Sequence, residues 1–268
     1  RDFCLSRGLG DVYKRQTLNQ NSSEIIYAFQ FKNIAPDNNM IQNQAGSRAV
    51  ADLDANTYFG GYDLAMPTPY YYEDVWEGQD GDTRKEASIR YDFILPDGRV
   101  PRITWTGQVD ELEPHIKKFE DFRTQGTQPF WYSGGLVYYL RLADILLCKA
   151  ECLNEIDKTA EAVDLVNATV RTRAFGGTLS TTEAWPTTMS KNDFRVRIMD
   201  ERIRELGFEG WRKMDLIRTG NFVNYVKERN IWAKNSGTLQ DFHERYPIPE
   251  SEIKQNENIN PEDQNPGY

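Results

Sequence analysis

Long hydrophobic runs are missing from this sequence of 268 residues. No window approaches the roughly 20 consecutive apolar residues that cross a bilayer, and the first thirty residues lack the basic start and apolar run of a signal peptide. The chain as given also has no initiator Met. We therefore expect the C-terminal part of a longer protein, with any targeting signal in the missing part.

Histidine and cysteine are scarce, with two His and three Cys. His115 and His243 are far apart, and no Cys or His spacing matches a zinc site. Cys148 and Cys152 lie one helical turn apart, and we interpret them as small buried apolar residues, not as a disulfide. Glycine-rich phosphate loops and Gly-x-Ser-x-Gly motifs are missing too. We expect no metal, no cofactor and no catalytic residue.

Positive charge is in the minority, because 32 Lys and Arg stand against 41 Asp and Glu, for a formal net charge of −9. Such a field repels phosphate backbones and anionic lipid surfaces, so nucleic acid is not an expected partner. The acidic residues are densest in "EDVWEGQDGD", residues 73–82. Their spacing is not that of an EF-hand, so we interpret this stretch as a solvated acidic turn. Calcium binding near Asp80 and Asp82 is the alternative.

The N-terminal third contains irregular chain with short strand signals. Residues 1–16 have no strand or helix period and resemble translated adapter sequence, so we expect a non-native or disordered extension there. "SSEIIYAFQF", residues 22–31, alternates as a half-buried strand does. Residues 32–135 are rich in turn formers and predict a loop-rich lobe, with a hairpin at Pro96–Arg99 whose second strand is "PRITWTG".

Residues 136–220 predict a helical framework, and residues 221–268 a C-terminal segment. The apolar positions of residues 138–155 recur at steps of three, four and seven, which indicates an amphipathic helix. A second helix is expected over residues 159–175, and a third starts near Asn192. A turn this short between the first two makes them antiparallel, as in tetratricopeptide repeats. We therefore predict a mainly α fold, of α+β type.

The third helix leads into a dense mixture of acids and bases, "DERIRELGFEGWRKMDLIRTG", residues 200–220. Within a helix, Glu201, Glu205 and Glu209 follow at four-residue steps, with Arg202 and Arg204 within reach. Apolar neighbours would bury these charges, so they must neutralise each other. Interleaved arginines would also hold the acids ionised, which disfavours a glycosidase. We interpret these charged residues as a structural network.

The stretch "ERIRELGFEGWRKMDLIRTG" resembles the signature of the SusD/RagB family of outer-membrane nutrient-binding lipoproteins. Three further stretches agree in order: "YLRLADILLCKAECLNE", "NATVRTRAF" and the terminal "YPIPESEIKQNENINPEDQNPGY". "SSEIIYAFQF" and "GDTR" also sit where the family has a strand and an Asp-x-Arg turn. The resemblance covers residues 22–268. The family's recurrent charged residues correspond here to Glu201, Arg202, Glu205, Glu209, Arg212, Asp215 and Arg218.

The resemblance implies the C-terminal half of a protein that stacks tetratricopeptide-like helix pairs beside a loop-rich lobe. It implies binding of a glycan or other nutrient at the cell surface and delivery to a TonB-dependent SusC-type transporter, without catalysis. The full-length protein would be held at the outer membrane by a lipid anchor on the missing N-terminal part. The alternative is a tetratricopeptide-type scaffold that binds protein segments in a helical groove.

Sugars need aromatic platforms flanked by polar groups, and residues 54–76 offer the densest set in an irregular region. The residues around the Gly60-Gly61 pair are our candidates for glycan binding: Asn56, Tyr58, Phe59, Tyr62 and Asp63. Packing under the loops is the competing interpretation of these aromatics. Tyr70, Tyr71, Tyr72 and Trp76 are expected to anchor a short helix, and Trp131, Tyr132 and Trp185 are second-rank ligand candidates.

Overall fold

The structure is a computed structural model that describes residues 22–48, 60–95, 97–98, 103–105, 112–121, 124 and 132–268. The expected 1–16 extension and the turn residues Pro96 and Arg99 lie outside this part. The chain divides into two compact units, Arg1–Arg212 and Lys213–Tyr268. Helices predominate and the strands are few and short, so the predicted mainly α fold with short strands is confirmed.

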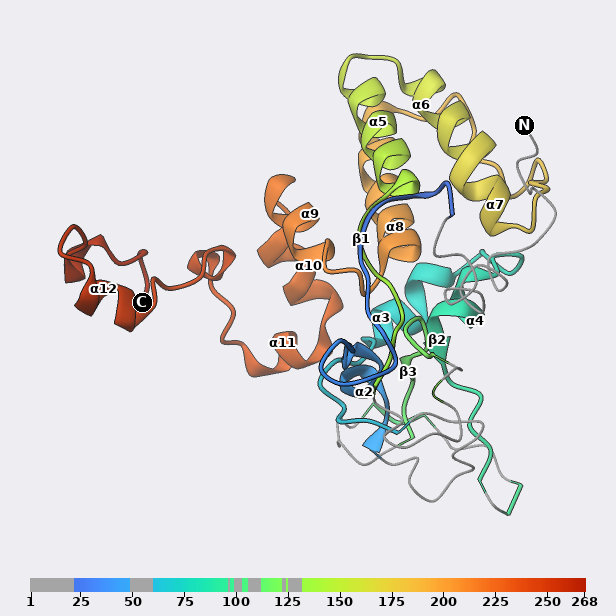
Figure 1. Cartoon of the computed structure of the whole chain (residues 1–268). Helices are drawn as coiled ribbons and strands as arrows, with labels where there is room; N and C mark the ends of the chain where they lie inside the picture. Colours follow the sequence, from blue (N-terminus) through green and yellow to red (C-terminus); the bar gives the residue numbers. More distant parts are fainter. Residues whose placement is uncertain are drawn as a thin grey trace. The chain divides into compact units, whose positions relative to one another are not determined.

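The helical framework of the first unit is built from packed antiparallel helices (Figure 1). Its elements are α5 (Leu142–Glu155), α6 (Thr159–Val166), a π-helical turn η4 (Asn167–Arg171), α7 (Thr172–Ala174) and α8 (Lys191–Leu206). Ser190 caps the N-terminus of α8, because its side chain accepts a hydrogen bond from the backbone N–H of Asp193. α5 packs against both α6 and α8.

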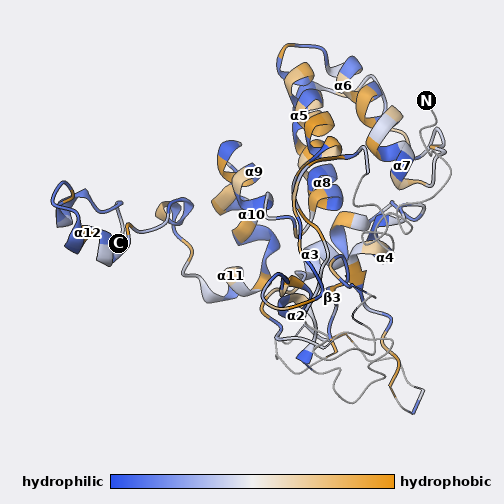
Figure 2. Ribbon diagram, in the orientation of Figure 1, coloured by the Kyte–Doolittle hydropathy of each residue, from blue (hydrophilic) through white to orange (hydrophobic). Residues whose placement is uncertain are grey.

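The core of this framework lies between α5, α6 and α8, where Figure 2 shows many hydrophobic residues along α5 and α6. Ala150 and Ala162 are fully buried, and their small side chains let the two backbones approach. Leu147 and Phe194 fill the space between the helices with 0% exposure. The predicted buried face of α5 is therefore confirmed. Cys152 is an exception because it is exposed on the opposite face, so the prediction that both cysteines are buried is wrong.

Two short antiparallel strand pairs connect the framework to the lobe. β1 (Ile25–Phe29) pairs with β4 (Val137–Arg141), and β2 (Ile89–Arg90) pairs with β3 (His115–Ile116). The helix expected from residue 138 begins instead at Leu142, because the β-branched and aromatic residues before it pair with β1. β2 pairs with β3, and residues 103–105 of the predicted hairpin partner form no strand, while the rest of that partner lies outside the described residues.

One face of the β1–β4 pair exposes aromatic rings. Tyr27 and Phe29 are 53% and 47% exposed, so their predicted inward alternation is wrong. Their rings meet Tyr139, which is 55% exposed, at centroid distances of 5.8 and 6.3 Å. Tyr139 also lies edge-on to Trp211 at 5.8 Å.

The lobe contains short helical elements separated by irregular chain. They are α2 (Ile41–Ala45), α3 (Pro69–Tyr72), the 3-10 turn η2 (Asp74–Trp76) and α4 (Arg84–Ser88). Tyr71 and Trp76 are buried beside Val75 and Ile89, as expected of residues that anchor α3. The indole N–H of Trp76 donates to the carbonyl of Tyr71 at 2.6 Å.

The second unit is a series of short, mostly exposed helices. They are the rest of α9 (Arg212–Arg218), α10 (Phe222–Arg229), α11 (Ile231–Ser236), η5 (Asp241–Glu244), α12 (Glu250–Gln255) and η6 (Pro261–Asp263). Gly220, at φ 68°, follows the end of α9. The ammonium of Lys213 lies 3.5 Å from the ring centroid of Tyr246, and the Tyr268 hydroxyl donates to the carbonyl of Arg245.

Buried charges join the lobe to α8. The side chain of Arg84, from the predicted Asp-x-Arg turn, has no exposed surface and pairs with Asp82 at 2.5 Å. Its Nη1 also lies 2.8 Å from Glu201 and 3.1 Å from Glu205. Asp82 is thus held in an internal ion pair, so its expected place in a solvated acidic turn is wrong.

Further cations surround the same carboxylates. Glu201 accepts from Arg171 at 3.1 Å and from Arg204 at 2.9 Å. Glu205 accepts from Arg141 and from Arg173, the latter at 2.7 Å. Since each acid meets at least two guanidinium groups, the buried charges compensate one another.

The remaining network residues do not lie on a single face of one helix. α8 ends at Leu206, so Glu209 lies beyond it, where it pairs with Lys118 and with Arg141 at 2.8 Å. The ammonium of Lys118 also donates to the carbonyls of Glu205 and Gly207, which lie at the end of the helix.

Arg202 finds its partners on another helix, because it pairs with Asp144 of α5 at 2.8 Å and with Glu151 at 3.5 Å. Arg212 donates to the carbonyl of Met199. In the second unit, Asp215 pairs locally with Arg218 at 2.8 Å.

The arginines decide the ionisation of the buried acids. Burial alone would raise the pKa of Glu201, but the guanidinium groups of Arg84, Arg204 and Arg171 lower it to about 2. Burial is likewise outweighed at Glu205, where Arg173, Arg141 and Arg84 hold the pKa well below its usual range.

We predict that Arg84→Met destabilises the chain by about 3–5 kcal/mol, because it leaves three buried carboxylates short of a partner. Urea unfolding followed by circular dichroism measures the change. Arg195→Met is the matched control, since it breaks the exposed Arg195–Glu155 pair and should have little effect. Equal stability of both variants would contradict a structural role for the network.

We predict that the contribution of Glu201 to stability depends on pH. Its folded-state pKa of about 2 lies below the ordinary 4.5, so its stabilisation is present above pH 4.5 and is lost as pH falls towards 2. The shift corresponds to about 3 kcal/mol. The difference in unfolding free energy between the wild type and Glu201→Gln should shrink over this range. A difference that stays constant from pH 6 to pH 3 would show that the carboxylate is not held ionised.

Candidate functional site

The described end of the predicted glycan loop, Gly60–Leu64, is fastened to α2 and the residues just after it. The backbone N–H groups of residues 61 to 64 donate to the carbonyls of Ser47, Asn43, Gly46 and Gln44, at 2.9 to 3.1 Å. A Cβ on Gly61 would lie only 2.2 Å from the Asn43 carbonyl oxygen, so this close approach requires glycine. The predicted residues Asn56, Tyr58 and Phe59 lie outside the described residues.

Asp63 faces inward from this segment. Its side chain has no exposed surface, and its Oδ1 lies 2.7 Å from Nε2 of the buried His115 and accepts from the backbone N–H of Arg48 at 3.0 Å. The backbone of Asp63 has φ 53°, a left-handed conformation that Asp adopts more readily than most residues. Asp63 therefore positions the segment in this conformation and does not present its carboxylate to solvent.

His115 connects Asp63 to the second strand pair. Its Nδ1 contacts the carbonyl of Glu113, and its Nε2 contacts the Asp63 carboxylate. Through these two contacts the ring joins β3 to the Asp63 segment and holds the base of the loop in place.

Tyr62 faces the other way. It is 52% exposed, and Leu64 is 67% exposed, so the segment alternates between outward and inward side chains. The Tyr62 ring is therefore available as one face of a sugar platform. Of the five predicted ligand residues, the structure describes one that is exposed, Tyr62, and one that is buried, Asp63.

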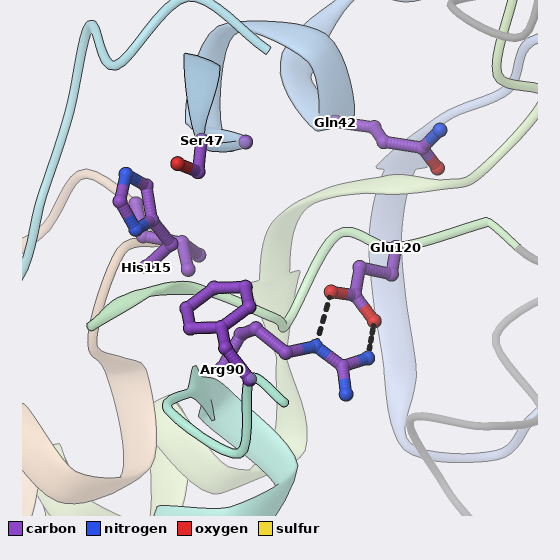
Figure 3. A pocket seen from close by; sticks show the side chains of 8 residues that line it. Gln42, Ser47, Arg90, His115 and Glu120 are labelled. Carbon is purple, nitrogen blue, oxygen red and sulfur yellow. Dashed lines mark hydrogen bonds and ion pairs between the residues drawn. The ribbon is translucent and has the colours of Figure 1, made fainter. Parts of the chain in front are cut away.

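A small polar pocket shares His115 and the end of α2 with this segment (Figure 3). It is lined by Gln42, Gly46, Ser47, Arg90, Phe93, His115, Ile116 and Glu120. The guanidinium of Arg90 donates two hydrogen bonds to the Glu120 carboxylate, drawn as dashed lines in Figure 3. The cavity volume is about 10 Å³, room for about one water molecule and not for a sugar ring.

The chemistry of this pocket is that of an internal ion pair. Burial raises the pKa of Glu120 above its usual value, although the hydrogen bonds and charge of Arg90 act in the opposite direction. Glu120 has a bidentate partner and sits beside a cavity too small for substrate, so it is not placed to protonate a glycosidic oxygen.

The second-rank ligand candidates differ in their exposure to solvent. Trp185 is 4% exposed and packs against Phe194 in the helical core, so its candidacy is wrong. Tyr132 is partly exposed, and Trp131 lies outside the described residues.

The acidic turn offers no cation site in the described part of the chain. Asp82 is held by Arg84, and Glu73 accepts a hydrogen bond from the indole of Trp105. No group of three or more His, Cys, Asp or Glu residues among the described residues is arranged to hold a metal ion.

Sequence reasoning missed His115 as a partner of Asp63, because 52 residues separate them and neither lies in a motif. It also placed Tyr72 among the buried anchors of α3, whereas the ring is only half-buried. The signal that could have separated Tyr72 from Tyr71 is its position beside the charged Glu73.

Known proteins with similar sequences and structures have the same fold as this chain. The profile of the SusD family matches residues 23–268. SusD-like protein P2 from Formosa agariphila is 30% identical over 229 residues, which cover 80% of this chain and 42% of that protein. A SusD homolog from Bacteroides thetaiotaomicron has a solved structure with a TM-score of 0.73 at 22% identity, covering 97% of this chain and 55% of that one.

A third similar protein is described as a laminarin-binding SusD-like protein, with 26% identity and a TM-score of 0.66. The similarity covers 96% of this chain and 53% of that one. The chain therefore spans about half the length of these solved relatives. The match over nearly the whole described chain, together with the shared fold, shows that the chain belongs to the SusD family.

Proposed function

We propose that this chain is part of a cell-surface protein that binds a glycan or other nutrient and delivers it to a TonB-dependent SusC-type outer-membrane transporter. Family membership supports this proposal, as does the likeness to a relative described as laminarin-binding. The exposed Tyr62 ring on a firmly held loop base is the structural observation that carries it. Asn56, Tyr58 and Phe59 complete the proposed ligand loop.

The proposed activity is binding without chemical turnover. A glycosidase needs one carboxyl group that donates a proton and one that stays ionised, both facing the sugar. The buried carboxylates Glu201, Glu205 and Glu209 are instead held ionised by cations. Glu120 faces a cavity that admits no sugar.

The proposed location is the cell-surface face of the outer membrane, with a lipid anchor in the full-length protein. Within the described residues, none of the helices has the length and apolar character that crossing a bilayer requires.

We predict that Tyr62→Ala weakens glycan binding about tenfold without changing the melting temperature, because it removes a stacking surface that is 52% exposed. Isothermal titration with laminarihexaose, cellohexaose and maltohexaose measures the affinity. Tyr246→Ala is the matched control, since Tyr246 is 73% exposed but lies in the second unit.

Equal affinity in Tyr62→Ala and the wild type would remove this loop from the proposal. Failure of the wild type to bind any of the three sugars, together with capture of a protein partner in their absence, would favour the scaffold alternative.

A further inference from the structure

Three aromatic rings from separate segments meet in the lobe, and none of them belongs to the proposed ligand loop. Tyr72 ends α3, Tyr91 follows β2, and Trp105 lies in the described segment 103–105. The Tyr72 ring centroid lies 5.5 Å from that of Tyr91 and 5.6 Å from that of Trp105. All three residues are partly exposed, so their rings contribute to the surface of the lobe.

A rigid base supports these rings. Tyr72 and Tyr91 pack against the buried cluster of Tyr71, Trp76 and Ile89, which are 3%, 6% and 0% exposed. Because the base is buried and closely packed, the rings above it lose little conformational freedom when a ligand binds.

Trp105 is held in an unusual backbone conformation. Its φ of 53° is rare for a bulky side chain and strains the backbone. The indole N–H donates to Glu73 at 3.0 Å, which fixes the ring beside Tyr72. Strain of this kind persists where the surrounding structure holds a side chain in place for binding.

The rings are accompanied by polar groups with unused hydrogen-bonding capacity. The Lys85 ammonium lies 4.3 Å from the centroid of Tyr72 and 5.8 Å from that of Tyr91. It forms no ion pair with a described residue, and the Tyr72 and Tyr91 hydroxyls form no hydrogen bond to one. Burial lowers the pKa of Lys85 and raises the pKa of both tyrosines.

The local charge indicates which sugars fit. Glu73 and Asp74 are exposed beside Tyr72, and Glu86 lies near enough to Tyr91 to raise its pKa. Among the described residues, these three carboxylates outnumber the ammonium of Lys85, since a fourth, Asp92, is paired with Arg90 at 3.0 Å, and the chain as a whole carries −9. Anionic sugars such as uronates would be repelled, whereas neutral hydroxyl groups can accept from Lys85 and donate to the carboxylates.

We propose that Tyr72, Tyr91, Trp105 and Lys85 form a second carbohydrate-binding surface, selective for neutral pyranose chains. The inference rests on the proposed function, because it assigns a further site and a ligand class to the same glycan-binding role. The exposed parts of the Tyr91 and Trp105 rings would stack on the C–H faces of the sugar, while Lys85, which lies over the Tyr72 ring, and the phenol groups would bind its hydroxyls.

The test measures sugar affinity in the full 268-residue chain by titration and tryptophan fluorescence. Laminarihexaose, cellohexaose and maltohexaose are the neutral probes, and hexagalacturonate is the anionic probe. We expect Trp105→Ala to weaken binding of the best neutral probe about tenfold. Lys85→Met should weaken it several-fold while keeping the fold. Tyr139→Ala, which removes a ring that is 55% exposed on β4, is the matched control and should bind as the wild type does.

The outcomes separate this inference from the proposed function. If the wild type binds a neutral probe and both Trp105→Ala and Lys85→Met bind it equally well, the second surface is wrong while the proposed function stands. Tighter binding of hexagalacturonate than of every neutral probe would overturn the neutral ligand class. If the wild type binds none of the four sugars, the second carbohydrate-binding surface is wrong, while the proposed function, which includes other nutrients, is overturned only if the chain also captures a protein partner. Circular dichroism of each variant shows whether an affinity loss reflects unfolding, and Lys85→Met decides the matter if Trp105→Ala unfolds.

Discussion

The guanidinium of Arg84, buried with 0% exposure, is the constraint on which the first unit depends. A charge without solvent must have partners, and Asp82, Glu201 and Glu205 supply them. These acids are themselves buried and need further cations, which come from β4, η4, α7 and α8. Each buried ion requires an oppositely charged partner, and that partner is buried as well. The ion pairs therefore extend into a network in which the charges compensate one another.

Arg84 is connected to the proposed ligand loop through α4, β2 and β3. Arg84 begins α4, which leads directly into β2, and β2 pairs with β3. β3 contains His115, whose ring holds Asp63 at the base of the loop. The start of α4 and the proposed ligand loop are thus linked through one short strand pair. A charged signature far from the loop in sequence would in this way serve the proposed binding without touching the ligand.

The elements that depend on local patterns could be predicted from the sequence. The helices over residues 142–155, 159–174 and 191–206 follow from their apolar period, and the family motifs indicated the fold. Contacts between distant segments could not be predicted. The strand before α5 depends on pairing with β1, more than 100 residues away, and the partners of Arg202 lie on α5. The exposure of Tyr72 likewise depends on Tyr91 and Trp105, which no local pattern places beside it.

The glycine at position 61 limits how the proposed ligand loop can be engineered. Its backbone lies so close to the Asn43 carbonyl that any larger residue would push the loop away from α2. A mutant library for altered recognition would therefore keep positions 61 and 63 constant. Position 61 has no room for a side chain, and Asp63 contacts His115 at the base of the loop. Diversity belongs at positions 62 and 64, whose outward side chains can change size and polarity while the backbone frame is retained.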